Sequence, residues 1–284
     1  MTFLGLGDRV WLWLASACYL IGFIFGTAAL LRDQRQSRLT IYGLVATGFI
    51  LQTLGLYLRG ETVKGCPIGN TFEIFQFTAW SAILLYLVVG ATFRLSLLGY
   101  FTSCLSAVLT LAALATPAWD ATRHVAAFGG NAWVSFHAAL ALFSYGVFAL
   151  LALTSTMYLL QTYSLKRKHL NGLFSFLPSI LELDHICVRL LVVGVILMTW
   201  SLAVGSVHWV RDFSSVDMTK LLVTAGVWAA YSGAMVLRLW NKLVSQRLAW
   251  ACVALFAIAL LSLGPINASR HPVAPAAPAS ATKT

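Results

Sequence analysis

Long apolar stretches separated by short polar segments make up most of the chain. Eight such stretches lie at about 10–31, 39–58, 72–93, 95–116, 132–161, 186–208, 218–240 and 247–265. Each is close to, or longer than, the roughly 20 residues that an α-helix needs to cross a bilayer. Backbone N–H and C=O groups cannot stay unpaired in lipid, so each stretch is expected to be helical. The pattern predicts an all-α, polytopic membrane helical bundle with eight transmembrane helices.

The composition agrees with a chain that lies in a membrane and excludes most soluble enzymes. Hydrophobic residues make up 60% of the 284 residues and charged residues only 10%. The mean hydropathy is +0.83. A soluble domain has about 25% charged residues, so too little polar surface is present to cover a water-soluble fold. We expect one transmembrane unit over residues 1–267 and a disordered tail, rich in Ala and Pro, over 268–284.

The distribution of charge predicts the orientation of the bundle. One side of the membrane receives segments 32–38, 94, 162–189 and 238–247, with eleven basic and three acidic residues. The other side receives eight basic and six acidic residues. Basic loops lie in the cytoplasm, so both termini are expected on the outer side, in a bacterial cytoplasmic membrane. The net charge of +10 reflects this topology, and no nucleic-acid partner is expected.

One histidine stands out as a candidate ligand. His137 lies inside an apolar stretch, where an ionisable side chain usually faces a cavity or a partner. Trp133 precedes it by four residues and lies on the same face of the helix. An imidazole beside a flat aromatic wall suits a porphyrin, whose iron two neutral imidazoles can hold without a covalent bond. The alternative is a neutral His137 that is hydrogen-bonded to a neighbouring helix.

Other residues at the outer face complete a candidate haem site. His271 follows the last apolar stretch and is the preferred second ligand, with His208 as the alternative. Arg123 and Arg211 are available to pair with the haem propionates. The chain has five separate cysteines and no CxxCH motif, so a bound haem would be non-covalent haem b.

Two carboxylates at the outer face are expected to cap helices. Asn70 followed by Glu73 resembles the start of a capping box, and Asp217 lies just before the seventh apolar stretch, where Asp stabilises a helix N-terminus. Binding of haem by Glu73 would require its carboxylate to turn into the bundle.

Three segments resemble the cytochrome c assembly protein family. They are a Pro-x-x-Asn-x-x-Glu start with a following Phe and Trp, a Trp-x-x-x-His helix, and a Gly-Ser-x-x-Trp segment with an outer loop and a further helix. The matching residues are Pro67, Asn70, Glu73, Phe77 and Trp80, then Trp133, His137, Tyr145 and Gly146, then Gly205, Ser206, Trp209, Asp217, Lys220, Trp228 and Tyr231. Tyr145 and Gly146 stand in reversed order relative to the family.

The resemblance implies that haem is held at the outer face and presented to apocytochrome c. It gives Trp209 and Asp217 a place beside the haem, and His137 and His271 the role of ligands. The Trp-rich loop of the family is replaced by 213–220, and Leu237 stands where haem-transporting members have a histidine. In these departures the chain resembles the shorter HemX-like and YpjD-like members of the family. The resemblance also implies a separate membrane partner that carries an outer domain.

The resemblance favours an assembly factor over a free-standing enzyme. The main alternative is a HemX-like regulator of haem biosynthesis that acts through its cytoplasmic loops. A further alternative is a transporter or a structural membrane protein. A transporter would show a polar route through the middle of the membrane, where the sequence offers mainly small hydroxyl side chains and Gln76.

Overall fold

The computed structural model describes residues 3, 5–32, 37–93, 96–121, 132–167, 179–211 and 218–268. Nine helices occupy these residues, and no named strand occurs among them. The helices are α1 (Asp8–Leu31), α2 (Arg38–Val63), α3 (Thr71–Phe93), α4 (Ser96–Ala115), α5 (Ala118–Ala121), α6 (Ala132–Arg167), α7 (Ile180–Arg211), α8 (Met218–Leu239) and α9 (Ser245–Ala268). The all-α fold class expected from the sequence is therefore confirmed.

The eight long helices coincide with the eight apolar stretches. Within the described residues, seven of them are long and apolar enough to cross a membrane. In α9 the described apolar part covers Ser245–Leu261, although the helix itself continues to Ala268. The chain is thus a multi-pass membrane protein. Helices α6 and α7 extend past their apolar stretches, and the four-residue α5 was not predicted because it is too short to give a hydrophobic period.

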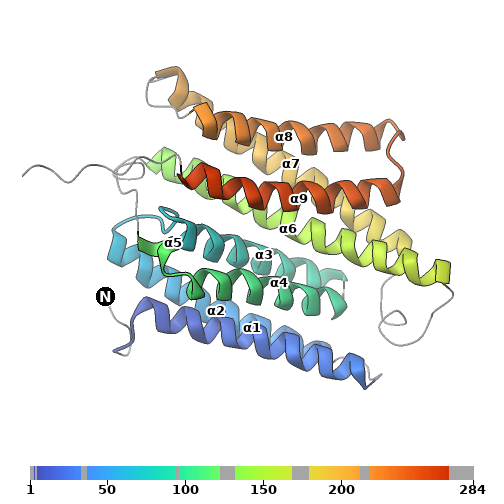
Figure 1. Cartoon of the computed structure of the whole chain (residues 1–284), viewed down its shortest axis with the longest axis horizontal. Helices are drawn as coiled ribbons and strands as arrows, with labels where there is room; N and C mark the ends of the chain where they lie inside the picture. Colours follow the sequence, from blue (N-terminus) through green and yellow to red (C-terminus); the bar gives the residue numbers. More distant parts are fainter. Residues whose placement is uncertain are drawn as a thin grey trace, which may run out of the picture.

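The long helices run back and forth between two ends of the bundle (Figure 1). Helices α1, α3, α6 and α8 begin at one end, which we call the Asp8 end, and the other long helices return to it. The opposite end, where α1 finishes beside Arg32, is the Arg32 end. The start of α1 and the finish of α9 therefore lie at the same end, as an even number of long helices requires.

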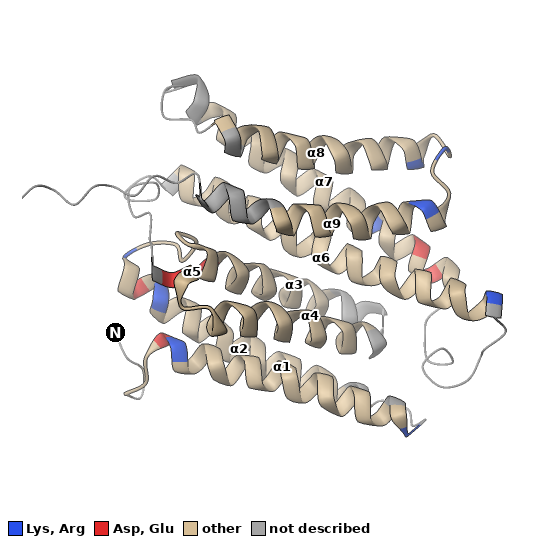
Figure 2. Cartoon of the chain, viewed as in Figure 1, with Lys and Arg blue, Asp and Glu red and all other residues tan. Residues whose placement is uncertain are grey.

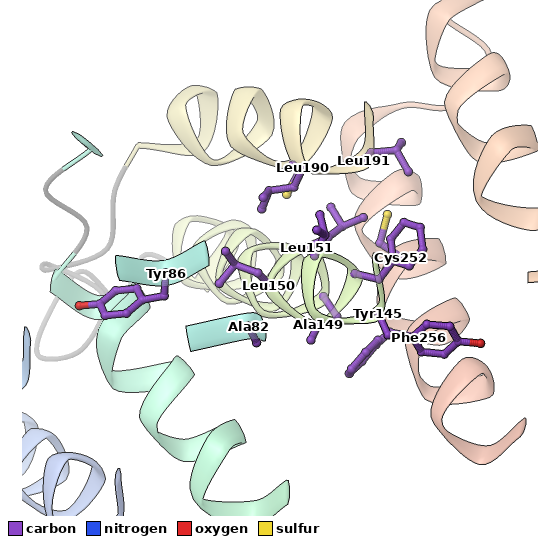
Figure 3. Packing of buried hydrophobic residues seen from close by; sticks show 14 of the residues in the cluster. Ala82, Tyr86, Tyr145, Ala149, Leu150, Leu151, Leu190, Leu191, Cys252 and Phe256 are labelled. Carbon is purple, nitrogen blue, oxygen red and sulfur yellow. The ribbon is translucent and has the colours of Figure 1, made fainter. Parts of the chain in front are cut away.

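Helix α6 lies at the centre of the apolar core. Its Leu150 and Leu151 pack between α3 on one side and α7 and α9 on the other (Figure 3). Gly146 allows α6 to approach α3 closely, because a Cβ at this position would lie 2.0 Å from the Ser81 Oγ. This packing fixes the position of α6, which carries His137.

Charged residues lie toward the two ends of the bundle (Figure 2). Among the residues with described side chains, the Asp8 end has the basic residues Arg9, Arg59 and Lys64, together with four carboxylates. The Arg32 end carries twice as many: Arg32, Lys166, Arg189, Arg238, Lys242 and Arg247. This excess of basic residues at the Arg32 end is expected if that end is cytoplasmic. The outward orientation of the Asp8 end stays a prediction.

Candidate functional site

His137 lies five residues after the start of α6 and packs against α7. Its Nδ1 is 2.7 Å from the carbonyl oxygen of Ser201. The Ser201 hydroxyl lies 3.1 Å from the same nitrogen and donates a hydrogen bond of 3.0 Å to the His137 carbonyl oxygen. Because a carbonyl oxygen can only accept, the imidazole Nδ1 carries the proton, and in the neutral ring Nε2 then carries the lone pair.

The backbone of α7 leaves room for this imidazole at Gly205. A Cβ at position 205 would lie 2.7 Å from the His137 Cε1 and 2.9 Å from its Nδ1. Real Cβ atoms essentially never come that close to another heavy atom. The ring can therefore lie against α7 at this turn because residue 205 is glycine.

The aromatic neighbours of His137 face outward. Trp133 is one turn nearer the Asp8 end and is 70% exposed, and Phe136 is 54% exposed. In a membrane these side chains meet lipid. A half-buried imidazole with its lone pair on Nε2, beside an exposed indole, is a donor set that fits a porphyrin, since haem offers an axial position to nitrogen and a flat face to an aromatic ring.

The structure brings only some of the other sequence-predicted residues to this site. His208, Trp209 and Arg211 belong to the last turn of α7, at the same end of the bundle as His137, but their side chains are not described. Arg123, Asp217 and His271 lie outside the described residues. Within the described residues, no three His, Cys, Asp or Glu side chains gather to hold a metal ion.

Glu73 combines the expected cap with an ion pair. Its backbone N–H donates to the Asn70 Oδ1 at 2.8 Å, which is the first half of a capping box. Its carboxylate accepts from the Gly69 N–H at 2.6 Å and from the Arg59 Nε at 2.8 Å. Glu73 is fully buried, so the capping carboxylate is also the partner of a mostly buried guanidinium.

This ion pair belongs to a larger group at the Asp8 end, which we call the Arg59 cluster. Its members come from α1, α2, α5 and the start of α3, and they are Asp8, Arg9, Arg59, Asn70, Glu73 and Asp120. The Arg59 guanidinium pairs with Glu73, Asp8 and Asp120. Asp120 also accepts hydrogen bonds from Arg9 and from the Asn70 Nδ2. The cluster joins four segments of the chain through charge-assisted hydrogen bonds.

The electrostatics of the cluster keep Asp120 ionised. Burial alone would raise the pKa of this carboxyl, but the hydrogen bond from Arg9 and the charge of Arg59 bring its pKa below the ordinary value. Sequence reasoning assigned Asp8, Arg9, Arg59 and Asp120 only to the outer side. No local motif links them. Asp120 reaches Arg59 because α5 packs against α3, which packs against α2.

A second polar chain lies deeper, inside α1–α4. The Tyr19 hydroxyl donates to the Gln52 Oε1 at 2.9 Å, and the Gln52 Nε2 donates to the Gln76 Oε1 at 3.0 Å. The Gln76 Nε2 donates in turn to the Thr110 carbonyl oxygen at 3.4 Å. Tyr19, Gln52 and Gln76 are fully buried. Each of the four helices contributes one partner, and none of these groups is charged, so the chain joins the helices rather than offering a charged path.

The cysteines are not paired with one another. All five are free thiols. Cys66, in the loop before α3, is the only one outside a helix. Burial and the nearby Glu73 carboxylate raise the pKa of its thiol. It is therefore protonated at neutral pH and is not an activated nucleophile.

Comparisons with known proteins agree with the motifs found in the sequence. A family model described as "Cytochrome C assembly protein" matches residues 68–266. The chain is 27% identical over 217 residues to a Protein HemX from Brevibacillus brevis, covering 75% of this chain and 79% of the relative. It is 26% identical over 258 residues to a Protein HemX from Bacillus subtilis, covering 88% and 92%. The matched region begins just before α3 and includes His137, Ser201 and Gly205.

Proposed function

Because this chain belongs to the cytochrome c assembly protein family, we propose that it binds haem at the Asp8 end and is an accessory factor in cytochrome c maturation. The observation that carries the proposal is the contact of the His137 Nδ1 with the Ser201 carbonyl oxygen at 2.7 Å. Histidines that ligate metals usually donate their other ring N–H in this way. In this proposal the iron ligand is the other ring nitrogen, Nε2.

The other residues of the proposed site have distinct roles. Trp133 lies beside one face of the porphyrin, and His271, with His208 as the alternative, supplies the second ligand. Arg123 and Arg211 pair with the propionates. Trp209 and Asp217 lie beside the haem, as the family resemblance implies. Glu73 is the remaining candidate of the site, and its carboxylate accepts hydrogen bonds from Arg59 and Gly69.

The chemistry of maturation belongs to the haem vinyl groups and the thiols of apocytochrome c. In this proposal the chain contributes binding, orientation and an axial ligand, as an assembly factor rather than a free-standing enzyme. Its partners are apocytochrome c and a separate membrane protein with an outer domain. It resides in a bacterial cytoplasmic membrane with the Asp8 end outward.

The absorption spectrum of the purified protein with added haemin tests the proposal. We expect low-spin bis-imidazole bands in the wild type, loss of these bands in His137→Ala, and partial recovery when imidazole fills the vacated position. His185→Ala, in α7 near the Arg32 end, is the matched control and should keep the bands. A wild-type protein that takes up no haem at micromolar concentration would contradict the proposal. Bands that persist in His137→Ala would contradict the ligand assignment.

The second candidate function is regulation of haem biosynthesis through the cytoplasmic loops. It is favoured by the similarity to two HemX proteins over 75% and 88% of this chain. Deletion within 166–181 separates the candidates. A regulator would lose its effect on haem synthesis, whereas a protein that binds haem at the Asp8 end would keep its haem spectrum.

A further inference from the structure

We infer that Ser201 and Gly205 are positioning residues, which hold the His137 imidazole against α7 with the proton on Nδ1 and the lone pair on Nε2. The inference concerns α7, the helix against which the ring packs. The inference deepens the proposed function. Its consequence, axial ligation of haem by His137, rests on that function.

The first step is the choice of tautomer. A neutral histidine in water prefers neither arrangement strongly enough to fix one, so the protein must select it. Here the selecting group is the backbone carbonyl of Ser201, 2.7 Å from Nδ1. Because it is a backbone group, no substitution of the Ser201 side chain removes it.

The second step is the orientation of α6 and α7 at this turn. The Ser201 hydroxyl donates to the His137 carbonyl oxygen at 3.0 Å, so the residue that presents its carbonyl to the ring also holds the backbone that carries the ring. Ser201 is 1% exposed, and water does not compete for these bonds. Ser201→Ala keeps the carbonyl and removes only this second bond.

The third step is the space for the ring. A methyl group at position 205 would lie 2.7 Å from Cε1, 2.9 Å from Nδ1 and 3.3 Å from Nε2. All three are consecutive atoms of the imidazole ring, so the methyl group would overlap the ring itself. Gly205→Ala must therefore push the ring away from α7, and the contact between Nδ1 and the Ser201 carbonyl is lost with it.

Two other glycines provide matched controls. On the same helix, a Cβ at Gly194 would lie 2.3 Å from the Phe148 Cε1, so Gly194→Ala introduces a comparable clash that does not touch His137. On α8, nothing lies within 4 Å of a Cβ at Gly226. Gly226→Ala therefore tests the effect of a glycine substitution without a clash.

The arrangement of the ring is tested without haem. We expect the nitrogen chemical shifts of histidine labelled with ¹⁵N, assigned to His137 by comparison with His137→Gln, to show a protonated Nδ1 and an unprotonated Nε2 in the wild type. Gly205→Ala should lose this signature, and Gly194→Ala and Gly226→Ala should keep it. A wild-type protein with the proton on Nε2 would overturn the inference, whatever the variants do.

The consequence is tested with haemin. Gly205→Ala should weaken haem binding by about 10–100-fold, the usual effect of losing a group that orients a metal ligand, and Ser201→Ala should weaken it less. If Gly205→Ala leaves both the nitrogen shifts and the haem bands unchanged, the inference fails while the proposed function stands. If the wild type shows the expected shifts but binds no haem, the proposed function fails while the arrangement of the ring stands.

Discussion

At the scale of single residues, Glu73 shows how a local motif can understate the role of a side chain. The sequence predicts a capping carboxylate, for which Glu73→Gln would cost about 1 kcal/mol or less. The structure retains that cap and adds Arg59, whose guanidinium lies between three carboxylates. Nothing in the spacing of the residues predicts this pair, because Arg59 lies on another helix, fourteen positions earlier.

The Arg59 cluster gives a prediction for two substitutions. Glu73→Gln removes one charge-assisted bond but leaves Arg59 with Asp8 and Asp120, so we expect a loss of about 1.5–3 kcal/mol in the free energy of unfolding. Arg59→Ala leaves three carboxylates without their shared partner and should cost more, about 3–5 kcal/mol. Unfolding in detergent measures both. Glu61→Gln, exposed at the same end, is the control and should change stability by about 0.5 kcal/mol or less. Equal costs for Glu73→Gln and Arg59→Ala would contradict the central role of Arg59.

At the scale of elements, the hydrophobic pattern predicts the long helices well because the bilayer imposes one solution on every apolar stretch. The eight long helices were expected within a few residues at most ends. The pattern does not predict α5, nor which polar ends meet. Gln52 and Gln76 illustrate the limit. Each is a single polar residue in an apolar stretch, and only the packing of α2 against α3 shows that they bond to each other at 3.0 Å.

The contact between α3 and α6 provides a prediction at the same scale. Gly146, which stands in reversed order with Tyr145 relative to the family pattern, lies against the Ser81 side chain and the Ala82 backbone nitrogen. Gly146→Ala inserts a methyl group where no space exists, so we expect a loss of about 1–3 kcal/mol, seen as a lower melting temperature in detergent. Gly226→Ala on α8, with nothing within 4 Å, should not destabilise the protein. A neutral Gly146→Ala would show that α3 and α6 separate easily.

At the scale of the whole molecule, the candidate site depends on the orientation of the bundle. His137, the end of α7 and the Arg59 cluster all lie at the Asp8 end. The sequence identifies His137 because a histidine in an apolar helix is unusual. It does not identify Ser201 and Gly205 as its partners, since small residues on α7 look like any other helix-packing positions. The sequence thus names His137 as a candidate ligand at one end of one helix, while the contacts that surround it could be known only from the fold.

The orientation itself is the last prediction. The Arg32 end carries six described basic residues against three at the Asp8 end, and basic loops stay in the cytoplasm. Because α1 begins and α9 finishes at the Asp8 end, one measurement at each end determines the whole arrangement. Alkaline phosphatase, which is active only outside the cytoplasm, should be active when fused within 117–131 and inactive when fused within 162–185. Green fluorescent protein fused at the same positions should give the opposite result and serves as the control. Activity of alkaline phosphatase at 162–185 would place the Asp8 end in the cytoplasm, and a site for presenting haem outside the cell could not then be built around His137.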